Sequence, residues 1–181
     1  MTVDAWLDLL ILVLIWAGVA GAWNFLAGFG GQFSLGHAAF FGLGAYTPAL
    51  LALNFGIVPW IGIPAGMALA ALFALLISSV SLRTRGPFFT LITIAFAEVL
   101  RILAVYSRSV TNGSEGLIVD LPQGLANLHY YDKGPYVVMA AVFAFAVFAA
   151  CLLARRSRFG YQLLAIREDE EAARSLGVAA F

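Results

Sequence analysis

Five long apolar stretches, separated by shorter polar segments, set the pattern of this chain. Each is close to the roughly 20 apolar residues that a helix needs to cross a bilayer. The predicted spans are residues 6–26, 36–55, 58–82, 88–106 and 136–154. The pattern therefore predicts an all-α, polytopic integral membrane protein with about five transmembrane helices.

Composition agrees with this class. Apolar residues make up 62% of the chain and charged residues only 11%, whereas soluble domains carry about 25% charged residues. The net charge is zero, which leaves no basic surface for nucleic acid. Because Cys151 is the only cysteine, we expect no internal disulfide and no metal or cofactor site. Residues 1–181 are expected to form a single transmembrane domain in contact with membrane lipid.

Arginines orient the predicted spans, because positive charge near membrane helices is retained in the cytoplasm. The arginines that follow the third and fifth spans are Arg83, Arg85, Arg155, Arg156 and Arg158. With alternating span directions, the third and fifth spans end on the same side, and that side is the cytoplasm only if the N-terminus is outside. Residues 107–135 then form an external loop, and the carboxyl terminus is cytoplasmic.

The carboxyl-terminal segment, residues 155–178, is too polar to be a further span. It reads "RRSRFGYQLLAIREDEEAARSLGV". Its four consecutive acids, residues 168–171, and the later Gly177 are typical start and end signals of a helix. Helices that lie on membranes are usually rich in Lys and Arg, so the acids favour docking to a protein partner.

A glycine-rich segment, residues 30–48, interrupts the most hydrophobic half of the chain. Ser34, Ala38 and Gly42 share one small face if the helix begins near Ser34. Gly62 and Gly66 form a second small pair in the third span. Small residues permit close packing of membrane helices, so tight packing is the favoured interpretation.

Polar residues in the same segment favour the wall of a transport pathway. Gln32 and His37 are costly in hydrocarbon unless they face protein or a water-filled cavity. The pair Gly30–Gly31 is expected to break the helix, and Pro48 removes a helical hydrogen bond. Gln32, Ser34, His37 and Gly42 are therefore candidates for the pathway or for helix packing.

Two charged residues lie inside the fourth span, in "FAEVLRIL". Glu98 and Arg101 are three residues apart, so they share one helical face. Pairing lowers the cost of placing charge in a membrane. We predict an intramembrane ion pair with a structural role.

Four landmarks together resemble the M-type (LivM-like) permeases of branched-chain amino-acid ABC importers. In order, they are "GGQFSLGHAAFFGLGAYT", "GPFFTLITIAFAEVLR", "TNGSEGL" and "SRFGYQLLAIREDEEAARSLGV". The last contains Glu171-Ala172-Ala173, three further residues and Gly177, which matches the EAA-x-x-x-G pattern of ABC importer permeases. The resemblance extends over residues 23–178.

The resemblance implies that residues 155–178 form a short cytoplasmic coupling helix seated in a groove of an ATPase. The residues it implies for this coupling are Glu168, Asp169, Glu171, Ala172, Ala173 and Gly177. It also implies a partner permease subunit, two cytoplasmic ATP-binding subunits and an external solute-binding protein, in a prokaryotic inner membrane. The chain would be a transport subunit and not an enzyme. It lacks the G-x-x-x-x-G-K-[ST] motif, and its one lysine, Lys133, is in the predicted external loop.

Several alternatives remain open at this stage. Urea and amide importers have similar permeases. A secondary transporter driven by an ion gradient would need paired ionisable groups at mid-membrane, for which Glu98 and Arg101 are the candidates. An intramembrane serine hydrolase would use Ser34 and His37, but a G-x-S-x-G setting and a nearby orienting acid are missing. No H-E-x-x-H motif suggests a zinc protease.

Permeases of this family continue past the coupling segment with several more spans. The chain ends four residues after Gly177. We therefore expect a truncated gene product or a fragment, with an incomplete transmembrane domain.

Overall fold

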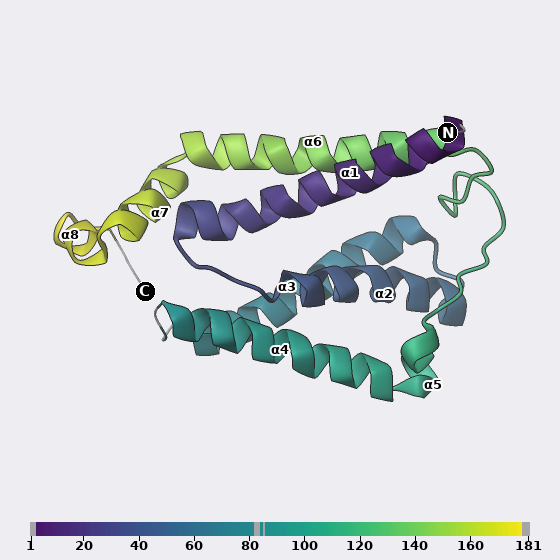
Figure 1. Cartoon of the computed structure of the whole chain (residues 1–181), viewed down its shortest axis with the longest axis horizontal. Helices are drawn as coiled ribbons and strands as arrows, with labels where there is room; N and C mark the ends of the chain where they lie inside the picture. The colour runs from purple at the N-terminus through teal and green to yellow at the C-terminus, as the bar shows by residue number, and fades with distance from the viewer. Residues whose placement is uncertain (1–2, 82–83, 85, 179–181) are drawn as a thin grey trace. The chain divides into compact units, whose positions relative to one another are not determined.

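Five long helices dominate the structure, a computed structural model that describes residues 3–81, 84 and 86–178 (Figure 1). The five are α1 (Val3–Asn24), α2 (His37–Phe55), α3 (Pro59–Ser81), α4 (Pro87–Tyr106) and α6 (Gly134–Arg156). All are long and apolar enough to cross a membrane, which confirms the predicted all-α, multi-pass fold. The predicted end of the third span at Leu82, and the arginines Arg83 and Arg85 that follow it, lie outside the described residues.

The glycine-rich segment breaks the helix where the sequence predicts a break. After α1, the chain makes one wider π-helical turn, η1 (Phe25–Phe29). Gly31 then has a φ of 66°, and residues 31–36 are not helical. Because α2 begins only at His37, Ser34 lies outside that helix, and the predicted helical face from Ser34 to Gly42 is wrong at its first position.

The chain folds into two compact units. They are Met1–Phe33 with Asp132–Phe181, and Ser34–Tyr131. In the first unit, α1 and α6 lie side by side and run in the same direction (Figure 1). A Cβ at Gly18 would clash with the ring of Phe143, so glycine permits the close approach on which membrane helices depend. The Lys133 ammonium group donates to the Asp8 carboxylate at 2.5 Å, next to the starts of both helices.

In the second unit, α2 and α3 form an antiparallel hairpin, and α4 packs against both (Figure 1). A Cβ at Gly62 would lie 2.8 Å from Cβ of Pro48, and one at Gly66 would lie 2.9 Å from the carbonyl oxygen of Gly44. The predicted small pair of α3 therefore contacts the backbone of α2 directly. Pro48 lies within α2 and packs against α3.

The long loop, residues 107–135, contains two short helices: α5 (Arg108–Thr111) and η2 (Gly113–Glu115). Asn112, between them, and Gly113, the first residue of η2, have φ values of 59° and 63°. These left-handed conformations suit asparagine and glycine. The Thr111 hydroxyl lies within hydrogen-bond distance of the carbonyls of Ala104 and Ser107 and accepts from Gly113 N–H. The turn in "TNGSEGL" is thus held against the end of α4.

Candidate functional site

The carboxyl-terminal segment folds as two short helices, α7 (Arg158–Glu168) and α8 (Glu170–Ser175). Ser157 begins α7 because its hydroxyl accepts a hydrogen bond from Gly160 N–H at 3.1 Å, as Ser does at a helix N-cap. A Cβ at Gly160 would clash with the carbonyl group of Ala154. Glycine at this position lets α7 turn sharply away from the end of α6.

Asp169 separates the two helices. Its backbone is extended, with φ −158° and ψ 109°, and its carboxylate accepts from the N–H groups of Glu171 and Ala172 at 2.9 and 3.0 Å. Asp169 therefore caps α8, which Glu170 and Glu171 begin with the charges that a helix N-terminus favours. The sequence predicted one coupling helix here. The structure has two, because the aspartate carboxylate satisfies N–H groups that a continuous helix would bond to its own carbonyls.

Gly177 ends α8 in the manner predicted. Its φ is 85°, its N–H donates to Arg174 O at 3.0 Å, and Val178 N–H donates to Ala173 O at 3.0 Å. These two bonds around a left-handed residue define the Schellman motif, which is usually built on glycine. The spacing in EAA-x-x-x-G thus has a local physical basis, since it joins an acidic helix start to a glycine stop.

Among the residues predicted for coupling, only Ala173 is buried, with 3% of its surface exposed. The exposed members are Glu168, Asp169, Glu171, Ala172 and Gly177. Leu176, beside the glycine, is 84% exposed. Two ion pairs brace the helices, from Arg174 to Glu170 at 2.7 Å and from Arg167 to Glu168 at 2.9 Å. The segment therefore presents acidic groups and one large apolar side chain on a short braced scaffold.

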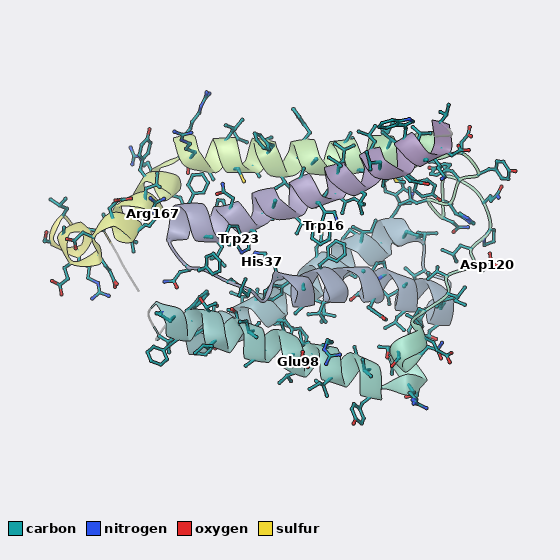
Figure 2. All side chains as sticks on the ribbon, viewed as in Figure 1. Trp16, Trp23, His37, Glu98, Asp120 and Arg167 are labelled. Atoms are coloured by element: carbon teal, nitrogen blue, oxygen red, sulfur yellow. The ribbon has the colours of Figure 1, made fainter. Side chains whose placement is uncertain are left out.

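Arg167 connects α7 to the broken end of α1, a contact that sequence reasoning missed. Its guanidinium donates to the carbonyl of Gly28 at 2.6 Å (Figure 2 labels Arg167). A Cβ at Gly31 would lie 2.7 Å from Cγ of Arg167. Gly31 thus has two roles, since it adopts a positive φ and its lack of a side chain makes room for the aliphatic part of Arg167. Two residues about 140 positions apart show no common periodicity, so no pattern in the sequence indicates this pair.

The polar candidates of the glycine-rich segment lie in different surroundings. Gln32 is half-buried, and its backbone N–H donates to Leu26 O at 3.4 Å. Ser34 is 2% exposed, and its hydroxyl accepts from Gly36 N–H at 3.3 Å. His37 begins α2, and its buried Nδ1 has no hydrogen-bond partner among the described residues.

Thr93 on α4 is the packing partner of this turn. Its hydroxyl accepts from Leu35 N–H at 3.2 Å, and a Cβ at Gly36 would lie 2.8 Å from the Thr93 carbonyl oxygen. Gly42 differs, because no atom lies within 4 Å of the place its Cβ would occupy. Close packing thus accounts for Gly36, while Gly42 borders open space.

Glu98 and Arg101 form the predicted ion pair. Arg101 Nε donates to one carboxylate oxygen at 2.9 Å, and its Nη2 donates to the other at 2.5 Å. Half of the Glu98 side chain and 65% of the Arg101 side chain are exposed. In the part of the chain that the structure describes, no cluster of His, Cys, Asp and Glu could hold a metal ion.

Comparison with known proteins gives a family match. The model of the family described as branched-chain amino acid transport system / permease component matches residues 5–181. Two curated relatives carry the name high-affinity branched-chain amino acid transport system permease protein LivM. The protein from Escherichia coli (strain K12) is 28% identical over 95% of this chain and 46% of its own length. The protein from Salmonella typhimurium is 27% identical over the same shares. The chain thus spans about half the length of the curated relatives it matches, and no solved structure matches it.

Proposed function

Because the chain belongs to the permease family of branched-chain amino acid transport systems, we propose that it is a permease subunit of an ATP-driven importer of branched-chain amino acids. The family match over residues 5–181 carries this proposal. The five apolar helices would form part of the translocation path, beside a partner permease subunit. An external solute-binding protein would deliver the amino acid to the outer face.

The coupling step is assigned to the carboxyl-terminal segment. Its two capped helices form a short projection on which Leu176 and three of the four acids, Glu168, Asp169 and Glu171, are exposed. Such a projection suits a groove in a folded partner. Two cytoplasmic ATPases that dimerise on ATP would move this projection. We assign ATP hydrolysis to those subunits, and the lack of a G-x-x-x-x-G-K-[ST] motif in residues 1–181 supports this assignment.

The proposed orientation places the N-terminus outside and the carboxyl-terminal segment in the cytoplasm of a prokaryotic cell. It is supported by Arg155 and Arg156 in the last turn of α6, since positive charge is retained inside. The parallel course of α1 and α6 also supports it, because the first and fifth of five alternating spans run in the same direction.

ATP-dependent uptake tests the function directly. The permease is reconstituted in proteoliposomes with its partner permease and ATPase, and the binding protein is added outside. We expect radiolabelled leucine to enter only with ATP, and unlabelled valine, but not urea, to compete. Uptake of urea or small amides in place of leucine would contradict the substrate. Leucine uptake driven by an ion gradient without ATP would contradict the transporter class.

A pair of charge-reversed variants tests the coupling assignment in the same assay. Glu171→Lys changes an exposed acid in the first turn of α8, and Glu115→Lys changes an exposed acid in the long loop. We expect Glu171→Lys to reduce both leucine uptake and the amount of ATPase that copurifies with the permease. The Glu115→Lys control should leave the copurified ATPase unchanged. If the two variants have equal effects on leucine uptake and on the copurified ATPase, α8 is not part of the docking surface.

A further inference from the structure

A long groove runs through the second compact unit, between α2 and α4 and up to the turn after α4. Its volume is about 680 Å³, within the roughly 300–1,000 Å³ of pockets that take small molecules. Its lining extends along α2 from Ala38 to Leu50, and along α4 from Ile94 to Val105. It therefore follows most of the length of two membrane helices.

The lining is mainly aliphatic, with a few polar groups. Leu43, Leu50 and Leu69 are among its aliphatic residues, and Tyr46 and Thr111 are among its polar ones. The Thr111 hydroxyl is engaged within its own turn. An apolar cavity with a small number of polar groups is the usual form of a small-molecule site. The end next to Thr111 belongs to the turn in "TNGSEGL", which the proposed orientation places at the outer face.

The ion pair of α4 lies in this groove, since both Glu98 and Arg101 line it (Figure 2 labels Glu98). Charged groups in a membrane are costly unless they face protein or a water-filled cavity. A lipid chain in the groove would leave the pair in contact with hydrocarbon. A polar occupant would not.

Glu98 and Arg101 both keep unused hydrogen-bonding positions for such an occupant. A guanidinium has five N–H donors, of which the bonds from Nε and Nη2 of Arg101 to Glu98 use two. A carboxylate offers about four acceptor positions, and the same two bonds occupy two of them. The pair can therefore accept one further cation on Glu98 and bind one further anion on Arg101 without separating.

Gly42 supplies an independent observation. Gly62 and Gly66 on α3 make room for α2, but Gly42 on α2 faces no atom within 4 Å and lines the groove. Gly44, two residues on, also has open space at its Cβ position and is not part of the lining. A side chain at Gly42 would project into the groove. Its absence leaves room for an occupant.

We propose that this groove is a binding subsite for a zwitterionic amino acid with an apolar side chain. Glu98 binds the α-ammonium group, Arg101 binds the α-carboxylate, and the aliphatic lining receives the side chain. The assignment rests on the proposed function for the identity of the ligand. It gives the ion pair a role in substrate recognition that a purely structural pair would not have.

Protection from a thiol reagent tests the subsite. In a Cys151→Ala background, Gly42→Cys and Gly44→Cys are made in the assembled permease complex, in proteoliposomes without the binding protein. Both are treated with a small, water-soluble methanethiosulfonate. We expect leucine to protect Gly42→Cys and not Gly44→Cys. The amine 3-methylbutylamine and the acid 4-methylpentanoate, which each lack one charge, should protect Gly42→Cys less.

Charge variants then test the pair itself. With Glu98→Gln or Arg101→Gln in the Gly42→Cys protein, the leucine concentration for half-protection should rise roughly tenfold to a hundredfold, as expected for one lost hydrogen bond to a charged group. The exchanged pair, Glu98→Arg with Arg101→Glu, keeps the ion pair but reverses its poles. It should not restore wild-type protection.

Several results would overturn the subsite. If Gly42→Cys does not react in the assembled complex, another protein segment or a lipid chain fills the groove. If it reacts and leucine does not protect it, or the exchanged pair restores protection, the pair is structural. The uptake assay separates this failure from failure of the proposed function. If the unmodified complex imports leucine with ATP but leucine does not protect Gly42→Cys, only the subsite is rejected.

Discussion

Gly177 has open space where a side chain would lie, since no atom is within 4 Å of its Cβ position. Only its backbone conformation, with φ of 85°, opposes replacement. An L-residue in this left-handed region costs about 1–2 kcal/mol, and asparagine tolerates it better than other residues. The role of the backbone can therefore be separated from the role of the side chain.

Gly177→Ala and Gly177→Asn separate the role of the backbone from that of the side chain. If the ATPase binds only the capped form of α8, Gly177→Ala should lower the affinity of the complex roughly fivefold to thirtyfold. Gly177→Asn should lower it less, although asparagine is the larger residue. Titration of purified ATPase onto immobilised permease measures both affinities. A greater loss with asparagine than with alanine would mean that the surface at Gly177, and not its conformation, is what the partner contacts.

Single residues differ in how far the sequence revealed their role. Gly177 and Asp169 lie in a local pattern, because a helix cap involves neighbours a few positions apart. The i, i+3 spacing of Glu98 and Arg101 is equally local, and the structure contains that pair. Arg167 could not be found in this way, because its partner Gly28 belongs to a distant helix.

At the scale of elements, α7 has two links to the membrane helices of its own unit. One is covalent, through Ser157 to α6. The other is the bond from Arg167 to Gly28 in η1. A π-helical turn followed by a positive-φ glycine is a weak point in a helix, so a displacement of α7 would reach α1 at the place where it bends most easily.

Arg167→Leu tests the second link. Leucine keeps an aliphatic side chain above Gly31, and it removes both the donor to Gly28 and the ion pair with Glu168. Because a charged hydrogen bond that is partly exposed contributes only about 1 kcal/mol, we expect leucine uptake per ATP hydrolysed to fall roughly twofold to tenfold. Copurification of the ATPase should not change. Arg158→Leu, an exposed arginine at the start of the same helix, is the control, and an equal fall in both variants would contradict a specific link.

The elements themselves were largely predictable, with instructive exceptions. Hydrophobic length alone predicted all five spans, because a bilayer imposes one length on every crossing helix. Gly30–Gly31 predicted the break between the first and second spans. The predicted start of the second span lies within one residue of the start of α2. The small face assumed to begin at Ser34 was wrong at that position, since Leu35 N–H bonds to the Thr93 hydroxyl instead of forming a helical bond. The division between α7 and α8 was also missed, because four consecutive acids do not reveal which one turns its carboxylate onto the backbone.

At the scale of the whole molecule, the orientation in the membrane determines which side the loop end of the groove faces and which side the coupling segment faces. In the proposed orientation, which the charge on α6 and the alternation of span directions support, the long loop would lie outside and the carboxyl-terminal segment inside. On this arrangement an amino acid would enter the groove from the end near Thr111, and the ATPase would act from the opposite side. Both proposals would fail together if the orientation were reversed.

Cysteine labelling decides the orientation, and the structure selects the positions. Ser114 is exposed in the long loop and Glu168 is exposed at the end of α7, while Asp169 is unsuitable because its carboxylate caps α8. In a Cys151→Ala background, a membrane-impermeant maleimide applied to intact cells should label Ser114→Cys and leave Glu168→Cys unlabelled. Permeabilised cells should show labelling of both. If the intact cells show the reverse, α8 faces the outside, where no cytoplasmic ATPase can reach it.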